Sequence, residues 1–184
     1  MGKFDKKQTG QFLWRITYAH TIAYFIAGLF AATFMDYRTH YASDFLSHYM
    51  LPTDAPMVAV GPALQILRGL IMALVLLPFR EVIFSKNGWW KLALLIFGLS
   101  QICTIGATPG SFDGMIYTVL PLQYHLLGLP ETFAYILLFI GIMALAYKVE
   151  KRYINIIAAV LLGFIILMGV CGYLAAKGLM PMPQ

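Results

Sequence analysis

Residues 153–176 read YINIIAAVLLGFIILMGVCGYLAA and contain no charged side chain. A helix of about 20 consecutive apolar residues is long enough to cross the hydrocarbon core of a membrane. Four further apolar runs of this kind precede residues 153–176 along the chain. We therefore predict five membrane-spanning helices, at about residues 12–35, 57–79, 89–107, 131–148 and 153–176.

The composition of the whole chain supports this fold class. Of its 184 residues, 60% are hydrophobic and only 11% are charged, and the mean hydropathy is +0.76. A soluble domain has about 45–50% apolar and about 25% charged residues. These values exclude a soluble enzyme and a nucleic-acid-binding domain. The net charge of +5, taken alone, would have suited a protein that binds nucleic acid. We expect residues 1–184 to form one all-α domain, a polytopic helix bundle embedded in membrane lipids.

The distribution of Lys and Arg predicts how the bundle is oriented. Two of these residues fall on one side, Arg38 and Lys177, and Arg68 lies within a span. The other side collects ten: Lys3, Lys6, Lys7, Arg15, Arg80, Lys86, Lys91, Lys148, Lys151 and Arg152. By the positive-inside rule the N-terminus is cytoplasmic and the C-terminus is outside. We accordingly expect a multi-pass protein of the cytoplasmic (plasma) membrane.

The first outer segment, Met35–Pro56, has a four-residue period. Its polar members are Asp36, His40, Asp44 and His48, and an apolar stripe of Tyr37, Tyr41, Phe45 and Tyr49 runs beside them. This pattern predicts an amphipathic helix on the outer membrane face. His40, Asp44 and His48 would share one face of that helix, a ligand set that suits zinc or another divalent transition metal. The alternative is a solvated helix face without a metal.

The second outer segment, Thr108–Pro130, combines turn formers with an apolar run. It opens TPGSFDG at residues 108–114 and continues MIYTVLPL at residues 115–122, which is too apolar for a loop in water. We predict a re-entrant or interfacial half-helix, because non-helical backbone at membrane depth must be buried in protein or line a water-filled cavity. Asp113 and Tyr117 are its candidate ligand-binding residues. Glu131, which follows it, suits the N-terminal cap of the fourth span.

An arginine near the middle of the second span is the sharpest functional signal. Burying Arg68 at this depth costs about 2.5–3.5 kcal/mol on insertion scales, so a charge here indicates function. Gln65 lies on the same helix face, and Gln101 belongs to the third span. Together these three residues predict a polar pocket that accepts an anion. A structural ion pair between Arg68 and Asp113 is the alternative, and the two are compatible.

Two features of the first span complete the analysis. His20 lies inside the span and is a candidate ligand-binding residue, although a hydrogen bond to a neighbouring helix explains it more simply. Small residues recur every fourth position: Ala19, Ala23, Ala27 and Ala31. Such stripes let helices approach closely, either within the bundle or between subunits.

Three functions fit these patterns. The first is an outward-facing polar cavity that binds or passes a small polar or anionic solute, as a homo-oligomer or as a subunit of a larger membrane complex. The second is a metal-dependent membrane enzyme that acts on a lipid-type substrate at the outer leaflet, with His40, Asp44 and His48 as ligands. The third is an accessory or sensor subunit without chemistry. No Walker loop, HExxH, GxSxG or CxxC motif is present to choose between them.

Overall fold

A computed structural model describes residues 5–180, which form helices and turns without a strand. Lys3, one of the ten cations counted above, lies outside this range. The long helices are α1 (Lys6–Phe34), α3 (Pro56–Leu76), α8 (Leu129–Val149) and α9 (Arg152–Ala176). The shorter ones are α2 (Tyr37–Tyr41), η1 (Leu77–Phe79), α4 (Arg80–Ile83), α5 (Gly88–Ile96), η2 (Phe97–Ile102), α6 (Phe112–Tyr117) and α7 (Leu122–Leu127).

Four stretches of helix in the described residues are long and apolar enough to cross a membrane. They are Lys6–Phe34, Pro56–Ile83, Leu122–Val149 and Arg152–Ala176. The predicted span at residues 89–107 corresponds to a shorter apolar helix, Gly88–Ile102, in which α5 continues into the wide turn η2. The all-helical class and the four long helices are therefore confirmed, and the fifth span stays a prediction.

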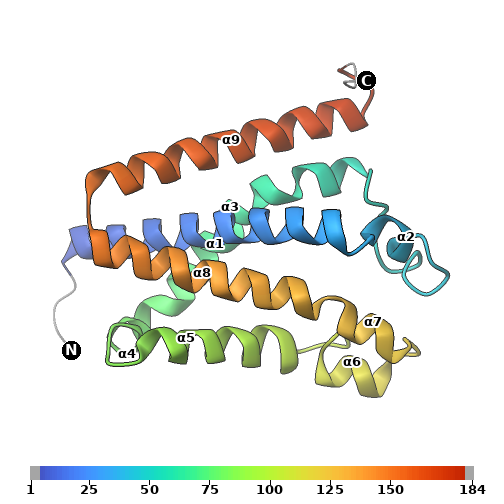
Figure 1. Cartoon of the computed structure of the whole chain (residues 1–184), viewed down its shortest axis with the longest axis horizontal. Helices are drawn as coiled ribbons and strands as arrows, with labels where there is room; N and C mark the ends of the chain where they lie inside the picture. Colours follow the sequence, from blue (N-terminus) through green and yellow to red (C-terminus); the bar gives the residue numbers. More distant parts are fainter. Residues whose placement is uncertain (1–4, 181–184) are drawn as a thin grey trace.

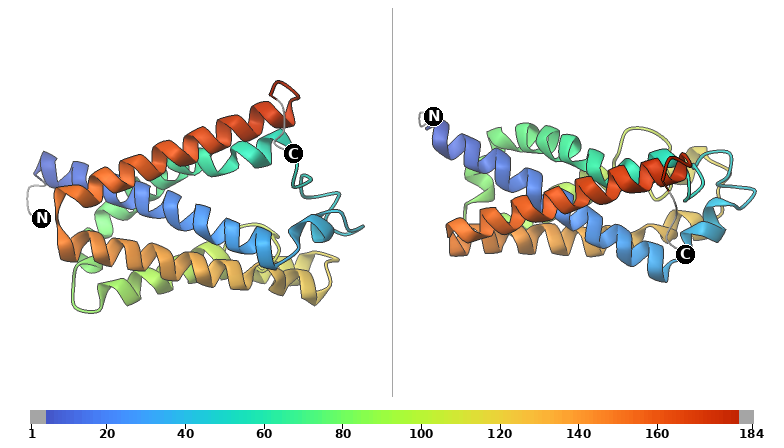
Figure 2. Two further views of the ribbon diagram at one scale, coloured as in Figure 1. Left: turned by 45° about the horizontal axis from the view of Figure 1, so that its top comes forward. Right: turned by 90° about the horizontal axis from the view of Figure 1, so that it is seen from above.

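The helices are arranged around α1, which packs against α3, α8 and α9. Helix α9 lies to one side of α1, and α8 and α5 lie to the other (Figures 1 and 2). Helix α3 begins beside α9 and crosses behind α1 towards α4 (Figure 1). One end of the bundle, here called the N-terminal end, carries the start of α1, α4 and the turn between α8 and α9. The opposite end, here called the loop end, carries α2, α6 and α7 (Figure 1).

Small residues allow the close helix contacts. The four alanines of the stripe, Ala19, Ala23, Ala27 and Ala31, are each at most 1% exposed. The stripe is therefore used for packing within the chain. On α3, a Cβ at Gly69 would lie only 2.9 Å from the Thr17 carbonyl oxygen of α1. A side chain larger than hydrogen at this position would push α3 away from α1.

The outer surface of the bundle is apolar. On α9 the side chains of Val160, Phe164 and Leu167 are 66%, 51% and 59% exposed. A continuous apolar surface of this kind is unfavourable in water and is satisfied by lipid tails. This surface supports the assignment as an integral membrane protein.

The first outer segment differs from the prediction of one amphipathic helix. Only Tyr37–Tyr41 is helical, and the residues that follow form turns. The Ser43 hydroxyl donates to the His40 carbonyl oxygen at 2.6 Å and accepts from the Leu46 amide at 3.4 Å. A serine that bonds to nearby backbone in this way competes with the helical ladder, which explains why the helix ends early.

The second outer segment also departs from a single half-helix. It consists of α6 and α7 with extended residues 118–121 between them. Pro121 disfavours a helical conformation at the residue before it, so one continuous helix is not formed. Several apolar side chains of the segment are exposed, among them Ile116 at 55% and Val119 at 90%. An exposed apolar surface is consistent with contact between this segment and the membrane interface.

Candidate functional site

A cavity of about 380 Å³ opens between α1, α3, η2 and α8, and the segment around α2 covers it towards the loop end. Each of these elements contributes polar side chains to its wall. They are His20 and Tyr24 of α1, Tyr37 and Tyr41 of α2, Tyr49, Arg68 of α3, Ser100 and Gln101 of η2, and Glu131, Thr132 and Tyr135 of α8. The cavity therefore gathers polar groups from helices that are otherwise strongly apolar.

His20 joins three helices at the base of the cavity. Its ring is 1% exposed, with Nδ1 2.7 Å from the Tyr135 hydroxyl and Nε2 3.2 Å from Oε1 of Gln65. An amide oxygen can only accept, so Nε2 carries the proton. In the neutral ring Nδ1 then accepts from the hydroxyl of Tyr135. Both ring nitrogens are satisfied, and α1, α3 and α8 are held in fixed positions around the cavity.

Arg68 provides a positive charge at the cavity wall. Its side chain is exposed, and it forms no hydrogen bond or ion pair with any residue between 5 and 180. Within the same range the only ion pair joins Arg15 to Glu150, so the alternative pairing of Arg68 with Asp113 is not formed. The guanidinium donors of Arg68 are therefore available to a solute in the cavity.

A carboxylate lies in the same cavity and is already hydrogen-bonded. Glu131 is in the first turn of α8, but no side chain among the described residues makes a capping hydrogen bond at the start of this helix. Oε2 of Glu131 instead accepts from the Tyr37 hydroxyl at 2.5 Å. Burial and the Glu131 carboxylate together raise the pKa of Tyr37 well above its ordinary value. Burial, followed by the charge of Glu131, raises the pKa of Tyr41 to about 12. Both phenols thus stay protonated and can donate at physiological pH.

Gln101 fixes the opposite wall of the cavity. Its Oε1 accepts from the Thr132 hydroxyl at 3.1 Å, which ties η2 to α8. The wide helical turn of η2 occurs where Ser100 and Gln101 face the cavity. Wide turns of this type are frequent at functional sites because they change the direction of side chains on an otherwise regular helix.

The predicted ligand-binding residues separate into three groups. His20, Arg68 and Gln101 line the cavity, whereas Gln65 lies behind it and supports His20. Asp113 and Tyr117 do not line it, and Tyr117 is 75% exposed on α6.

The tyrosines of the wall were not predicted as site residues. Tyr37 and Tyr41 were assigned to an apolar stripe, and Tyr24 and Tyr135 lie within spans. A phenol combines an apolar ring with a polar tip, so apolar periodicity alone cannot show where its hydroxyl points. Their signal in the sequence was the concentration of tyrosine near the loop end of several helices.

The three predicted metal ligands do not meet. In the described part of the chain, no group of three His, Cys, Asp or Glu side chains is placed to hold a metal ion. The ring of His40 stands edge-on to Tyr124 at 6.2 Å, and His48 Nδ1 lies 3.0 Å from the backbone carbonyl oxygen of Asp44. Because α2 ends at Tyr41, the four-residue period that would align these residues is lost.

The chemistry of the cavity is thus the main guide to function. It combines one cationic group that has no partner among residues 5–180, one hydrogen-bonded carboxylate and several neutral donors in a small space. No protein-family model, no curated protein and no solved structure matches this chain.

Proposed function

We propose that this protein binds, and passes, a small polar solute that carries an anionic group, in the cavity beneath α2. The observation that carries the proposal is Arg68, a cationic side chain at the cavity wall with no partner among the described residues. A charge within a membrane-length helix is expensive unless it faces water or an opposite charge. An anionic solute supplies that opposite charge.

The other walls indicate what the rest of the solute is like. Glu131 and the hydroxyls of Tyr37 and Tyr41 lie around the same space, so the end of the solute away from Arg68 carries hydrogen-bonding groups. The volume of about 380 Å³ is at the low end of the range of about 300–1,000 Å³ for ligand pockets. A small carboxylate with further polar groups fits both the chemistry and the size.

The direction of access follows from the proposed orientation. With ten Lys and Arg residues on the cytoplasmic side, the loop end and its cavity face outwards. A chain of 184 residues would carry out transport as an oligomer or with partner subunits in the membrane. The alanine stripe is occupied by contacts within the chain, so such an assembly would use the exposed apolar faces of the outer helices.

Substitution of Arg68 tests the proposal. The purified protein is heated with acetate, succinate, glutamate or inorganic phosphate, and the midpoint of thermal unfolding is recorded. We expect at least one anion to stabilise the wild type and the control Lys177→Gln, which removes the same charge from an exposed position. Arg68→Gln should bind that anion at least about tenfold more weakly, since a hydrogen bond to a charged group contributes about 1.5–3 kcal/mol.

Two further variants keep the test decisive if Arg68→Gln does not fold. Arg68→Lys keeps the charge, so partial stabilisation by the anion is expected. Ser100→Leu narrows the opposite wall without changing Arg68, and it should also weaken binding. Stabilisation by the same anion in Arg68→Gln and wild type, or stabilisation by none of the four anions, contradicts the proposal.

A further inference from the structure

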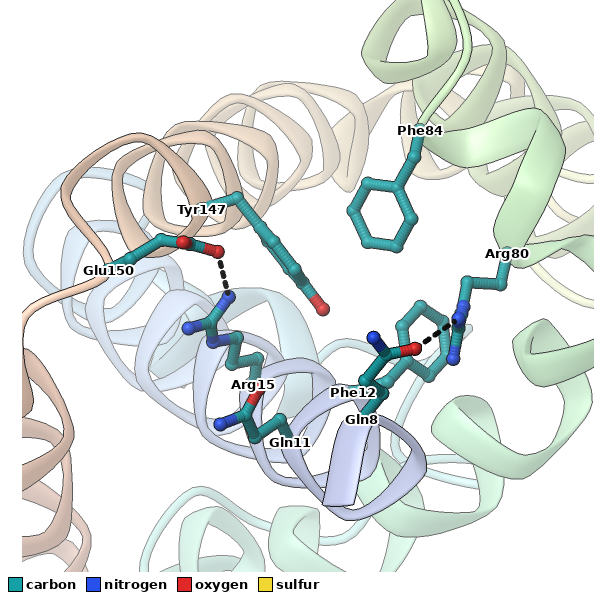
Figure 3. Close-up of a pocket in the computed structure, with 8 residues that line it drawn as sticks. All are labelled: Gln8, Gln11, Phe12, Arg15, Arg80, Phe84, Tyr147 and Glu150. Carbon is teal, nitrogen blue, oxygen red and sulfur yellow. Dashed lines mark hydrogen bonds and ion pairs between the residues drawn. The ribbon is translucent and has the colours of Figure 1, made fainter. Parts of the chain in front are cut away.

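A second cavity, of about 300 Å³, lies at the N-terminal end of the bundle. Figure 3 shows its walls, which include Gln8 and Arg15 of α1, Arg80 of α4, Tyr147 of α8, and Glu150 just after α8. None of its lining residues belongs to the cavity that contains Arg68. The two cavities are therefore separate sites, this one at the N-terminal end and the other towards the loop end.

Arg15 is the most buried charged group of this cavity. Its side chain is 7% exposed, and its guanidinium lies 4.2 Å from the centroid of the Tyr147 ring. Nη1 is 3.5 Å from Oε1 of Glu150, whose side chain is 66% exposed. This distance is longer than the roughly 2.7–2.9 Å of a charge-assisted hydrogen bond, so the ion pair is loose. Stacking on Tyr147 holds the guanidinium in place, and its donors remain available to a stronger acceptor.

Arg80 supplies a second positive charge on the other side of the same space. Its Nη2 donates to Oε1 of Gln8 at 3.1 Å. In Figure 3 the Tyr147 hydroxyl points into the region between the two arginines. Two guanidinium groups and the single carboxylate of Glu150 leave one net positive charge among the residues that line the cavity.

We propose that this cavity binds a phosphate group, carried by the headgroup of an anionic phospholipid. The planar fork of a guanidinium matches phosphate oxygens in geometry, and a phosphodiester carries one negative charge, opposite in sign to the net charge of the lining residues. Phe12 and Phe84 form an apolar part of the wall beside the arginines, as an amphipathic ligand requires.

The position of the cavity favours a lipid as the source of the phosphate. The cavity lies where the long helices end, which is the level of the headgroups in a membrane. Five further cations belong to the same end of the chain's helices: Lys6, Lys7, Lys148, Lys151 and Arg152. Basic groups near a membrane surface raise the local concentration of anionic lipid, and basic pockets between helices bind its headgroups.

Lipid titration of the full-length protein in detergent tests this site. Short-chain phosphatidylglycerol, phosphatidylcholine and inorganic phosphate are added separately, and retained lipid and the midpoint of thermal unfolding are measured. We expect phosphatidylglycerol to bind best. Arg80→Gln should bind it about tenfold more weakly than the control Lys86→Gln, which removes an equal charge from an exposed residue outside the cavity. Arg15→Lys keeps the positive charge but loses the planar guanidinium, so this variant should also bind phosphatidylglycerol more weakly.

The arms of the titration distinguish the sources of the phosphate group. If inorganic phosphate alone stabilises the wild type but not Arg80→Gln, the phosphate site is supported and its ligand comes from solution. If phosphatidylglycerol stabilises and free phosphate does not, the lipid is the ligand. Equal binding of phosphatidylglycerol to Arg80→Gln, Arg15→Lys and Lys86→Gln, or no binding of either ligand to the wild type, overturns the proposal.

Discussion

His20 is held by one donor and one acceptor from two different helices, and this makes its partners individually testable. Tyr135→Phe removes the hydroxyl that bonds to Nδ1 and leaves a buried acceptor without a partner. An unsatisfied buried polar atom costs about 1–3 kcal/mol, so the free energy of unfolding should fall by this amount. The measurement is denaturant or thermal unfolding in detergent.

The matched control is Tyr153→Phe, which removes a hydroxyl from an exposed residue of α9. Its stability should be close to that of the wild type. If both variants lose the same free energy of unfolding, the hydrogen bond between His20 and Tyr135 does not stabilise the fold. Other contacts must then hold the helices at the base of the cavity.

At the residue scale, the sequence predicted the charged and amide groups of the site better than the hydroxyl groups. Arg68 and Gln101 are conspicuous because polar side chains are rare in apolar spans, and both line the cavity. Glu131 could be placed at a helix start, yet its bond to Tyr37 joins residues 94 positions apart. Local patterns carry no information about contacts over such a separation.

Among the helices, the contact between α1 and α3 is the one that positions Arg68, and Gly69 makes it close. In Gly69→Ala the new Cβ would lie 2.9 Å from the Thr17 carbonyl oxygen and 3.1 Å from the Thr17 Cα. Both atoms are backbone, so the helices must separate, at a cost of about 1–3 kcal/mol. We expect lower thermal stability, together with weaker binding of the anion that Arg68 binds.

Gly141→Ala is the control, because no atom lies within 4 Å of the position that a Cβ would take. Alanine favours a helix over glycine by about 0.5–1 kcal/mol, so this variant should be at least as stable as the wild type. A Gly69→Ala variant that matched it in stability and anion binding would show that the helices do not need this close approach.

At the scale of elements, long apolar runs were predictable and the short outer helices were not. The free energy of placing a helix in lipid depends on summed hydropathy, which the sequence shows directly. The length of α2 depends instead on local bonds of Ser43 that compete with the helix. A four-residue period in Met35–Pro56 could not show that competition.

For the whole molecule, the path of α5 decides on which sides the two termini lie. Helix α1 begins at one end of the bundle and α9 finishes at the other (Figure 1). Gly88–Ile102 extends roughly 22 Å at about 1.5 Å per residue, which is less than a hydrocarbon core of about 30 Å. With α5 as a crossing helix, the two termini lie on opposite sides of the membrane, and the positive-inside rule predicts that the N-terminus is the cytoplasmic one.

Reporter fusions at each terminus test this topology. A fluorescent protein should fluoresce at the N-terminus, and alkaline phosphatase should be active at the C-terminus. If both termini report the same compartment, α5 and η2 do not cross, and the number of spans is four. Reversal of both reporters would instead show that the predicted orientation is inverted.

The two cavities also approach each other closely along α1. Arg15 lines one and His20 lines the other, and the residues between them, 16–19, are all buried. Five residues of helix correspond to roughly 7.5 Å along its axis. If water fills both cavities, the membrane voltage falls mainly across this thin layer instead of about 30 Å of hydrocarbon. An anion that moved from one cavity to the other would then cross most of the membrane potential within little more than one helical turn. At 100 mV, crossing the whole potential corresponds to about 2.3 kcal/mol per charge.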